Sequence, residues 1–82
     1  MADMNKTQMQ RSLMLMGEAQ AGDFFLKAEG RKDDTTYCFY VVPPRKTARD
    51  RVSFTIQANS RPSAYKNALR WLENFMANTP RA

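Results

Sequence analysis

The run TTYCFYVV, from Thr35 to Val42, constrains the fold of this chain more than any other segment. β-Branched and aromatic residues fill it, and these residues favour the extended backbone of a pleated, packed surface. Pro43 and Pro44 end the run, because proline has no N–H to donate to a β-ladder. The composition predicts a central strand with both faces at least partly covered.

Two other segments alternate apolar and polar residues, as a strand with one buried face does. They are residues 23–30 (DFFLKAEG) and residues 51–58 (RVSFTIQA). Glycine and two adjacent aspartates predict a turn over residues 30–35, whereas residues 17–22 (GEAQAG) read as a spacer. The linkers between strands favour an antiparallel three-stranded meander. Its apolar face carries Phe24, Leu26, Ala28, Val52, Phe54 and Ile56.

Apolar residues with helical spacing precede these strands. Met9, Leu13 and Met16 are separated by four and three positions, so residues 4–16 are expected to form a helix with one apolar stripe. Met14 and Leu15 widen the stripe, Asp3 or Asn5 can cap the start, and Gly17 can close the end.

A second helix is expected at the end of the chain. Ser60 is a good N-cap, Pro62 is tolerated in a first turn, and Asn78 and Pro80 end the pattern. The order is therefore α-β-β-β-α, an α+β domain with both helices on one sheet face. We expect one domain over residues 1–82, with residues 1–3 and 79–82 frayed. The stripe of the last helix comprises Ala64, Tyr65, Ala68, Leu69, Trp71, Leu72, Phe75 and Met76.

The residue types exclude most catalytic chemistry. The chain has no histidine, and its single cysteine cannot form an internal disulfide or a thiolate metal cluster. Its three glycines form no phosphate loop, and Asp33–Asp34 reads as a solvated turn. We therefore expect a non-enzyme without cofactor or metal. Neither a membrane span nor a signal peptide is recognisable, so a cytoplasmic location is the simplest interpretation.

Positive charge is concentrated in one third of the chain. The net charge is +5, and residues 45–70 contain seven of the 13 basic residues but one of the eight acidic ones. Such a one-sided field attracts polyanions or acidic protein surfaces, although it can also serve solubility alone. Cations on a loop suit phosphate contacts. The candidate contacts are Arg45, Lys46, Arg49 and Arg51 in the loop, and Arg61, Lys66 and Arg70 on the last helix.

The second face of the sheet offers aromatic residues. It carries Phe25 and Lys27 with either Tyr40 or Tyr37, depending on which face of the middle strand is covered. Exposed aromatics can stack on bases, form a homodimer or partner interface, or be covered by a loop or terminus.

The element order resembles the double-stranded-RNA-binding domain. The local match is residues 63–69 (SAYKNAL), which look like the lysine–alanine-rich start of that family's last helix. The resemblance implies that Lys66 contacts phosphate and that Arg31 and Lys32 lie in a contacting hairpin loop. The family's lysine run before the last helix and its glycine–proline–histidine hairpin pattern are missing.

Two functions follow as hypotheses. The first is a small nucleic-acid-binding protein that contacts phosphates through the 45–51 loop and the last helix. The second is an inhibitor or adaptor, of the kind that phages and mobile elements encode, which binds an acidic host protein. The second would use Phe25, Tyr40 or Tyr37 as anchors and the basic loop as a rim.

Overall fold

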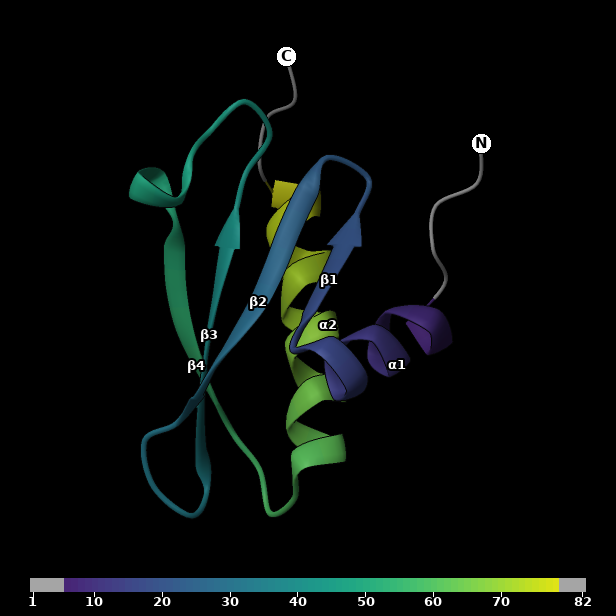
Figure 1. The fold of residues 1–82 in the computed structure, drawn as a ribbon, viewed down its shortest axis with the longest axis vertical. Coiled ribbons are helices and arrows are strands. Elements are labelled where there is room, and N and C mark those ends of the chain that lie inside the picture. Colours follow the sequence, from purple (N-terminus) through teal and green to yellow (C-terminus); the bar gives the residue numbers. More distant parts are fainter. Residues whose placement is uncertain (1–5, 79–82) are drawn as a thin grey trace.

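The computed structural model describes residues 6–78, which form a sheet with a helix at each end of the chain (Figure 1). The element bounds are α1 Lys6–Met16, β1 Glu18–Ala21, β2 Phe24–Arg31, β3 Thr36–Val42, the 3-10 turn η1 Ala48–Asp50, β4 Val52–Gln57 and α2 Arg61–Asn78. The predicted α+β class with terminal helices is confirmed.

The sheet has four antiparallel strands in the order β1-β2-β3-β4, so the predicted number of three strands is wrong. Residues 18–21, expected to be a spacer, form the additional strand β1. Ala19 and Ala21 of this strand face the core. Gly22, with a φ of 59°, lies at the first position of the two-residue turn into β2, where a type II′ hairpin needs positive φ. β1 is short and has alanine at its buried positions. It therefore lacks the β-branched and aromatic residues from which the other strands were predicted.

Both helices cover the same face of the sheet and contact each other (Figure 1). Gly17 ends α1 with a φ of 74°, and its N–H donates to the carbonyl of Leu13 at 2.9 Å. This left-handed closure, as predicted, lets the chain reverse directly into β1. Ser12 strengthens the corner by donating to the carbonyl of Glu18 at 2.6 Å.

The apolar stripe of α1 is shorter than expected. Met9 and Leu13 are buried, but Leu15 and Met16 are 77% and 67% exposed. Leu13 and Met14 of the last turn pack against the core, whereas Leu15 and Met16 lie on the outer side of the same turn, which no described element covers. The expected caps Asp3 and Asn5 lie outside the described residues.

The start of α2 agrees with the sequence pattern. Ser60 caps the helix, since its Oγ accepts from the N–H of Ser63 at 3.4 Å. The five buried residues of α2 all belong to the expected stripe: Ala64, Tyr65, Ala68, Leu69 and Leu72. Pro80 and the expected frayed segments, 1–3 and 79–82, lie outside the described residues. Within residues 6–78, neither helix combines the length and the apolar character that crossing a bilayer requires.

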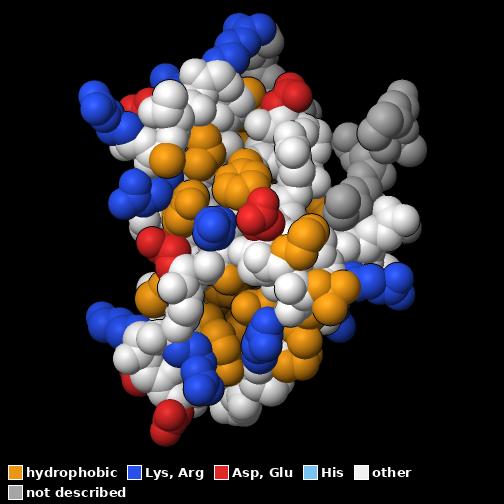
Figure 2. Space-filling model, viewed as in Figure 1, with side chains coloured by type: hydrophobic (Ala, Val, Ile, Leu, Met, Phe, Trp, Pro, Cys, Tyr) orange, Lys and Arg blue, Asp and Glu red, His pale blue; other side chains and the backbone are white. Residues whose placement is uncertain are grey.

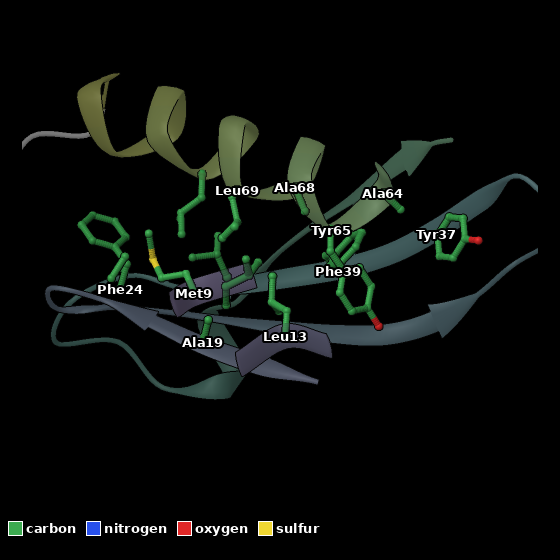
Figure 3. Packing of buried hydrophobic residues seen from close by; sticks show 14 residues of the cluster. Met9, Leu13, Ala19, Phe24, Tyr37, Phe39, Ala64, Tyr65, Ala68 and Leu69 are labelled. Atoms are coloured by element: carbon green, nitrogen blue, oxygen red, sulfur yellow. The ribbon is translucent and has the colours of Figure 1, made fainter. Parts of the chain in front are cut away.

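A chain of aromatic rings joins the sheet to α2. Phe39 lies at its centre, completely buried, with ring centroids 5.4 Å from Phe54 and 5.6 Å from Tyr65 (Figure 3). Phe54 stacks on Trp71 at 3.6 Å, and Trp71 stacks on Phe75 at 5.1 Å. Aromatic pairs of this kind add to the stabilisation that comes from burial alone.

Replacement of the central ring tests this core. We expect Phe39→Ala to lower the free energy of unfolding by about 3–5 kcal/mol, because it leaves a cavity between the rings of Phe54 and Tyr65. Chemical denaturation followed by the fluorescence of Trp71, the only tryptophan, measures the change. Lys66→Gln, at an exposed position of α2, should stay within about 0.5 kcal/mol of the wild type. Equal losses for the two variants would contradict the central position of Phe39.

Candidate nucleic-acid interface

The sheet has one face without a covering element among the described residues, called here the open face. In β3, Tyr37, Phe39 and Val41 point to the helices and are buried, whereas Cys38, Tyr40 and Val42 alternate with them and are only half-buried. The structure therefore decides between the two faces that the sequence left open. Tyr37, a candidate for an exposed aromatic interface, is 5% exposed, so that prediction is wrong, and Tyr40 takes the position.

Strand register gathers aromatic and basic side chains on the open face. Phe25 pairs with Val42, Lys27 pairs with Tyr40, and both pairs lie between β2 and β3. Arg51 joins them at the start of β4, where its guanidinium carbon lies 5.5 Å from the centroid of the Tyr40 ring. We call these five residues the open-face cluster: Phe25, Lys27, Tyr40, Val42 and Arg51.

Polar residues border the open-face cluster. Ser53, Thr55 and Gln57 of β4 are exposed beside it, and the register places Ser53 opposite Tyr40. Glu18 pairs with Lys27 from β1, so negative charge limits the cluster on that side. The electrostatically favourable direction for an anion runs from Lys27 across β3 and β4 towards Arg51.

The segment between β3 and β4, residues 43–51, forms an ordered turn and is called here the basic loop. The N–H of Lys46 donates to the carbonyl of Pro43 at 3.2 Å, which closes a turn in which Arg45 has a φ of 64°. Thr47 caps η1 by accepting from the N–H of Arg49 at 3.3 Å. Hydrogen bonds therefore give the loop a defined shape, although residues 45–51 are all exposed.

Arg51 connects the basic loop to the open-face cluster. Its Nη1 donates to the carbonyl of Ala48 at 2.8 Å while the guanidinium lies over Tyr40. The loop cations Arg45, Lys46 and Arg49 thus extend the cluster at one end of the sheet. No carboxylate within the described residues forms an ion pair with Arg51, so its charge is available to an anion.

The basic loop and the start of α2 lie at opposite ends of the sheet (Figure 1). β3 runs into the loop and β4 runs back to α2, so the two connections cannot share an end. Lys66 and Arg70 are exposed on α2, the layer opposite the open face. The expected surface shared by loop and last helix is therefore not formed. Figure 2 shows Lys and Arg side chains at both ends of the molecule, with hydrophobic side chains between them.

The other candidate residues lie at the α2 end. Arg61 donates from Nη2 to the carbonyl of Met14 at 2.7 Å and from Nε to the hydroxyl of Tyr65 at 3.3 Å. It therefore fastens the end of α1 to α2, a structural role that the sequence did not suggest. Arg31 lies 5.7 Å from the ring of Tyr37, and Lys32 is exposed in the β2–β3 turn.

Asp33 organises the β2–β3 turn. Its Oδ1 accepts from the N–H groups of Thr35 at 3.0 Å and Thr36 at 2.9 Å. These donors, that of Thr35 foremost, hold the pKa of Asp33 below its ordinary value. Among residues 6–78, no group of three or more His, Cys, Asp or Glu side chains is placed to hold a metal ion. Asp33 therefore stabilises the turn through its hydrogen bonds to Thr35 and Thr36.

Lys27 and Val42 belong to the open-face cluster, although the sequence did not single them out as candidate contacts; of the two, Lys27 carries charge. Its place in an alternating strand, directly after Phe25 and Leu26, already put it on the face of Phe25. The signal missing from the sequence was the register, which brings Tyr40 opposite Lys27.

Comparison with family models, with curated proteins and with solved structures gives no match. The resemblance to the double-stranded-RNA-binding domain depended on an order with three strands. Strand β1 adds a hairpin before β2, so Arg31 and Lys32 belong to the second hairpin of the sheet and not the first. This fold therefore gives no basis for equating Arg31 and Lys32 with the residues of that family's contacting hairpin loop.

Arg45 provides a test of the basic loop. A non-glycine residue with left-handed backbone costs about 1–2 kcal/mol, whereas glycine adds about 0.4–1 kcal/mol of unfolded-chain entropy. We therefore expect Arg45→Gly to leave the free energy of unfolding unchanged or to raise it by up to about 1 kcal/mol. Arg45→Gln keeps the strain and should not stabilise. Denaturant titration of both variants measures the difference, and a marked loss on glycine substitution would contradict the left-handed turn.

The Asp33 turn gives a pH dependence. Because the folded-state pKa of Asp33 is lowered, its stabilising effect is complete above the ordinary aspartate pKa and is lost as the pH falls through the lowered value. The difference in unfolding free energy between wild type and Asp33→Asn should therefore shrink towards zero in acid. Denaturation at a series of pH values measures it. Asp34→Asn removes the same charge from the same turn, and equal effects of both variants would contradict the role of Asp33.

Proposed function

We propose that this protein is a non-enzymatic binder of single-stranded nucleic acid, which lies across the open face and along the basic loop. The observation that carries the proposal is the position of Arg51, which stacks on Tyr40 and at the same time belongs to a loop with three other cations. The ring of Tyr40, on which a base could stack, is thus continuous with the basic loop, whose cations could bind phosphates.

The aromatic part suits unpaired bases. Phe25 and Tyr40 lie on adjacent strands of an uncovered sheet face and are both half-buried. Flat rings in such a position can stack on bases, with about 1–3 kcal/mol per base. Bases within a duplex are already stacked and show only their edges, so the platform favours a single strand.

The charged part suits the backbone of the same strand. Lys27 lies directly beside Tyr40, and the basic loop begins where β3 leaves the sheet. Phosphates on either side of a stacked base would therefore meet cations. The exposed residues of β4, such as Ser53 and Thr55, add hydrogen-bonding groups along the path.

An acidic protein partner is the competing interpretation of the same surface. It would also meet the loop cations, but it would need a continuous apolar centre for its anchor residues. In the open-face cluster Lys27 lies beside both aromatic residues, along the strand from Phe25 and across from Tyr40, and the β4 side is polar. This mixture of rings and cations favours nucleic acid.

The test measures binding of labelled oligonucleotides by fluorescence anisotropy at several salt concentrations. Single-stranded DNA and RNA should bind more tightly than the corresponding duplexes. In Arg49→Gln/Arg51→Gln, the slope of log affinity against log salt should fall by about 1.4, at about 0.7 per lost phosphate contact. Tyr40→Thr, which keeps a residue suited to strands, should lose about 1–3 kcal/mol of binding with the slope unchanged.

A matched control removes equal charge elsewhere. Lys66→Gln/Arg70→Gln changes two exposed cations of α2 and should leave affinity and slope nearly unchanged. Equal effects of the two double variants would reject the open face in favour of general charge attraction. Absent binding of every oligonucleotide, with an acidic polypeptide bound instead, would reject the nucleic-acid function itself.

A further inference from the structure

A second concave site lies on the helix side of the sheet, at the end opposite the basic loop. It has a volume of about 400 Å³ and lies between the end of β2, the start of β3 and the first turn of α2. The residues that give it its chemistry are Arg31, Tyr37, Phe39, Arg61 and Tyr65. Its volume is within the range of about 300–1,000 Å³ that small-molecule sites occupy. Figure 2 shows hydrophobic side chains flanked by Lys or Arg in this part of the molecule.

Two guanidinium groups from different elements line this pocket. Arg31 comes from β2 and lies 5.7 Å from the Tyr37 ring, and Arg61 comes from α2 and lies 5.3 Å from the Tyr65 ring. No acidic residue is among the described residues that line the pocket, and neither arginine forms an ion pair within residues 6–78. The pocket therefore has two positive charges without a neutralising partner in the described part of the chain.

The hydrogen-bonding groups of the pocket are only partly used. Arg61 employs Nε and Nη2 on Tyr65 and Met14, which leaves Nη1 free, while no side-chain hydrogen bond of Arg31 occurs within the described residues. The side chain of Tyr37 is 5% exposed. Within the described residues every buried polar side-chain atom has a hydrogen-bond partner, so the Tyr37 hydroxyl, which forms no hydrogen bond to these residues, is accessible from the pocket. A ligand oxygen in the pocket can therefore reach it.

The hydroxyl of Tyr37 lies apart from the rest of the core, at the end of the sheet. Tyr37 lies beyond Phe39 towards the end of the sheet, whereas Phe39 and Tyr65 lie together beneath α2 (Figure 3). The strand β2 continues past β1, because β1 pairs only with residues 24–27. The sheet end around Arg31 is thus left uncovered by β1, which opens the pocket to solvent.

The chemistry of the lining selects one ligand class. Two planar guanidinium groups can bind phosphate oxygens through pairs of parallel hydrogen bonds. A tyrosine hydroxyl can donate a further bond, and the side chain of Ala28 with the edges of Tyr37 and Tyr65 provides apolar surface. We propose that this pocket binds a phosphate monoester attached to an organic ring, such as a nucleoside monophosphate or the 5′-phosphorylated end of a strand.

The proposed site is independent of the open-face function. Tyr37 and Tyr40 lie on opposite faces of β3, and Arg31 and Arg51 belong to opposite ends of the sheet. A monophosphate can therefore bind whether or not a single strand binds to the open face.

The experiment is calorimetric titration of the full chain with uridine monophosphate, uridine, inorganic phosphate and a 5′-phosphorylated dinucleotide. We expect uridine monophosphate or the phosphorylated dinucleotide to bind, and uridine without phosphate not to bind. Arg31→Gln should weaken binding at least about tenfold, because a charge-assisted contact is lost. Tyr37→Phe removes only the hydroxyl and should weaken binding about three- to tenfold.

The controls separate the pocket from general charge and from misfolding. Lys32→Gln removes the neighbouring exposed cation, which does not line the pocket, and should bind as the wild type does. Arg61 is avoided because its loss would also release the carbonyl of Met14. Circular dichroism and Trp71 fluorescence verify the fold of each variant, and Tyr40→Thr should retain monophosphate binding.

Several results would overturn the proposal. They are no heat of binding for either phosphate monoester at millimolar concentration, inorganic phosphate binding as tightly as uridine monophosphate, or affinities that Arg31→Gln and Tyr37→Phe leave unchanged. Tighter binding of the free nucleotide or of the phosphorylated dinucleotide supports the site and identifies the source of the phosphate. Loss of single-strand binding in open-face variants has no bearing on these outcomes.

Discussion

The stacking of Phe54 on Trp71, with ring centroids 3.6 Å apart and planes 8° apart, joins β4 to the middle of α2. β4 is an edge strand, and its neighbour β3 provides Phe39, which also stacks on Phe54. The helix is thereby fixed along the strands it covers. Within residues 6–78 the helices form one such covering layer, so fixing α2 on one side leaves the other side of the sheet without a described covering element.

Strand alternation then assigns opposite tasks to neighbouring residues. Phe39 is buried beneath α2, while the next residue, Tyr40, lies on the open face with the guanidinium of Arg51 over its ring. A slip of β3 by one residue would exchange them, placing a phenol with its arginine in the core and an unpartnered phenyl ring outside. The same register that completes the core therefore places the open-face cluster, and the proposed binding surface needs no element beyond those that fold the domain.

The sequence was sufficient for the features that depend on local pattern. Glycine at position 17, serine at 60 and the stripe of α2 predicted the helix ends and the packed positions, because capping and periodicity act within a few residues. Strand β1 was missed because alanine carries little strand preference. The choice between Tyr37 and Tyr40 could not be made, since both faces of the run are apolar. The placement of the basic loop away from the start of α2, by contrast, follows from antiparallel connection alone and was within reach of the sequence.

Each proposed site uses an arginine held against a tyrosine. The guanidinium carbons of Arg31, Arg51 and Arg61 lie 5.3–5.7 Å from the centroids of Tyr37, Tyr40 and Tyr65. An arginine on an open surface loses rotamer entropy when it binds an anion. A guanidinium already oriented over a ring has lost part of that freedom in folding, and its edge remains available for hydrogen bonds. The tyrosines therefore distinguish these three arginines from the exposed cations of the loop and of α2, which contribute charge but no fixed geometry.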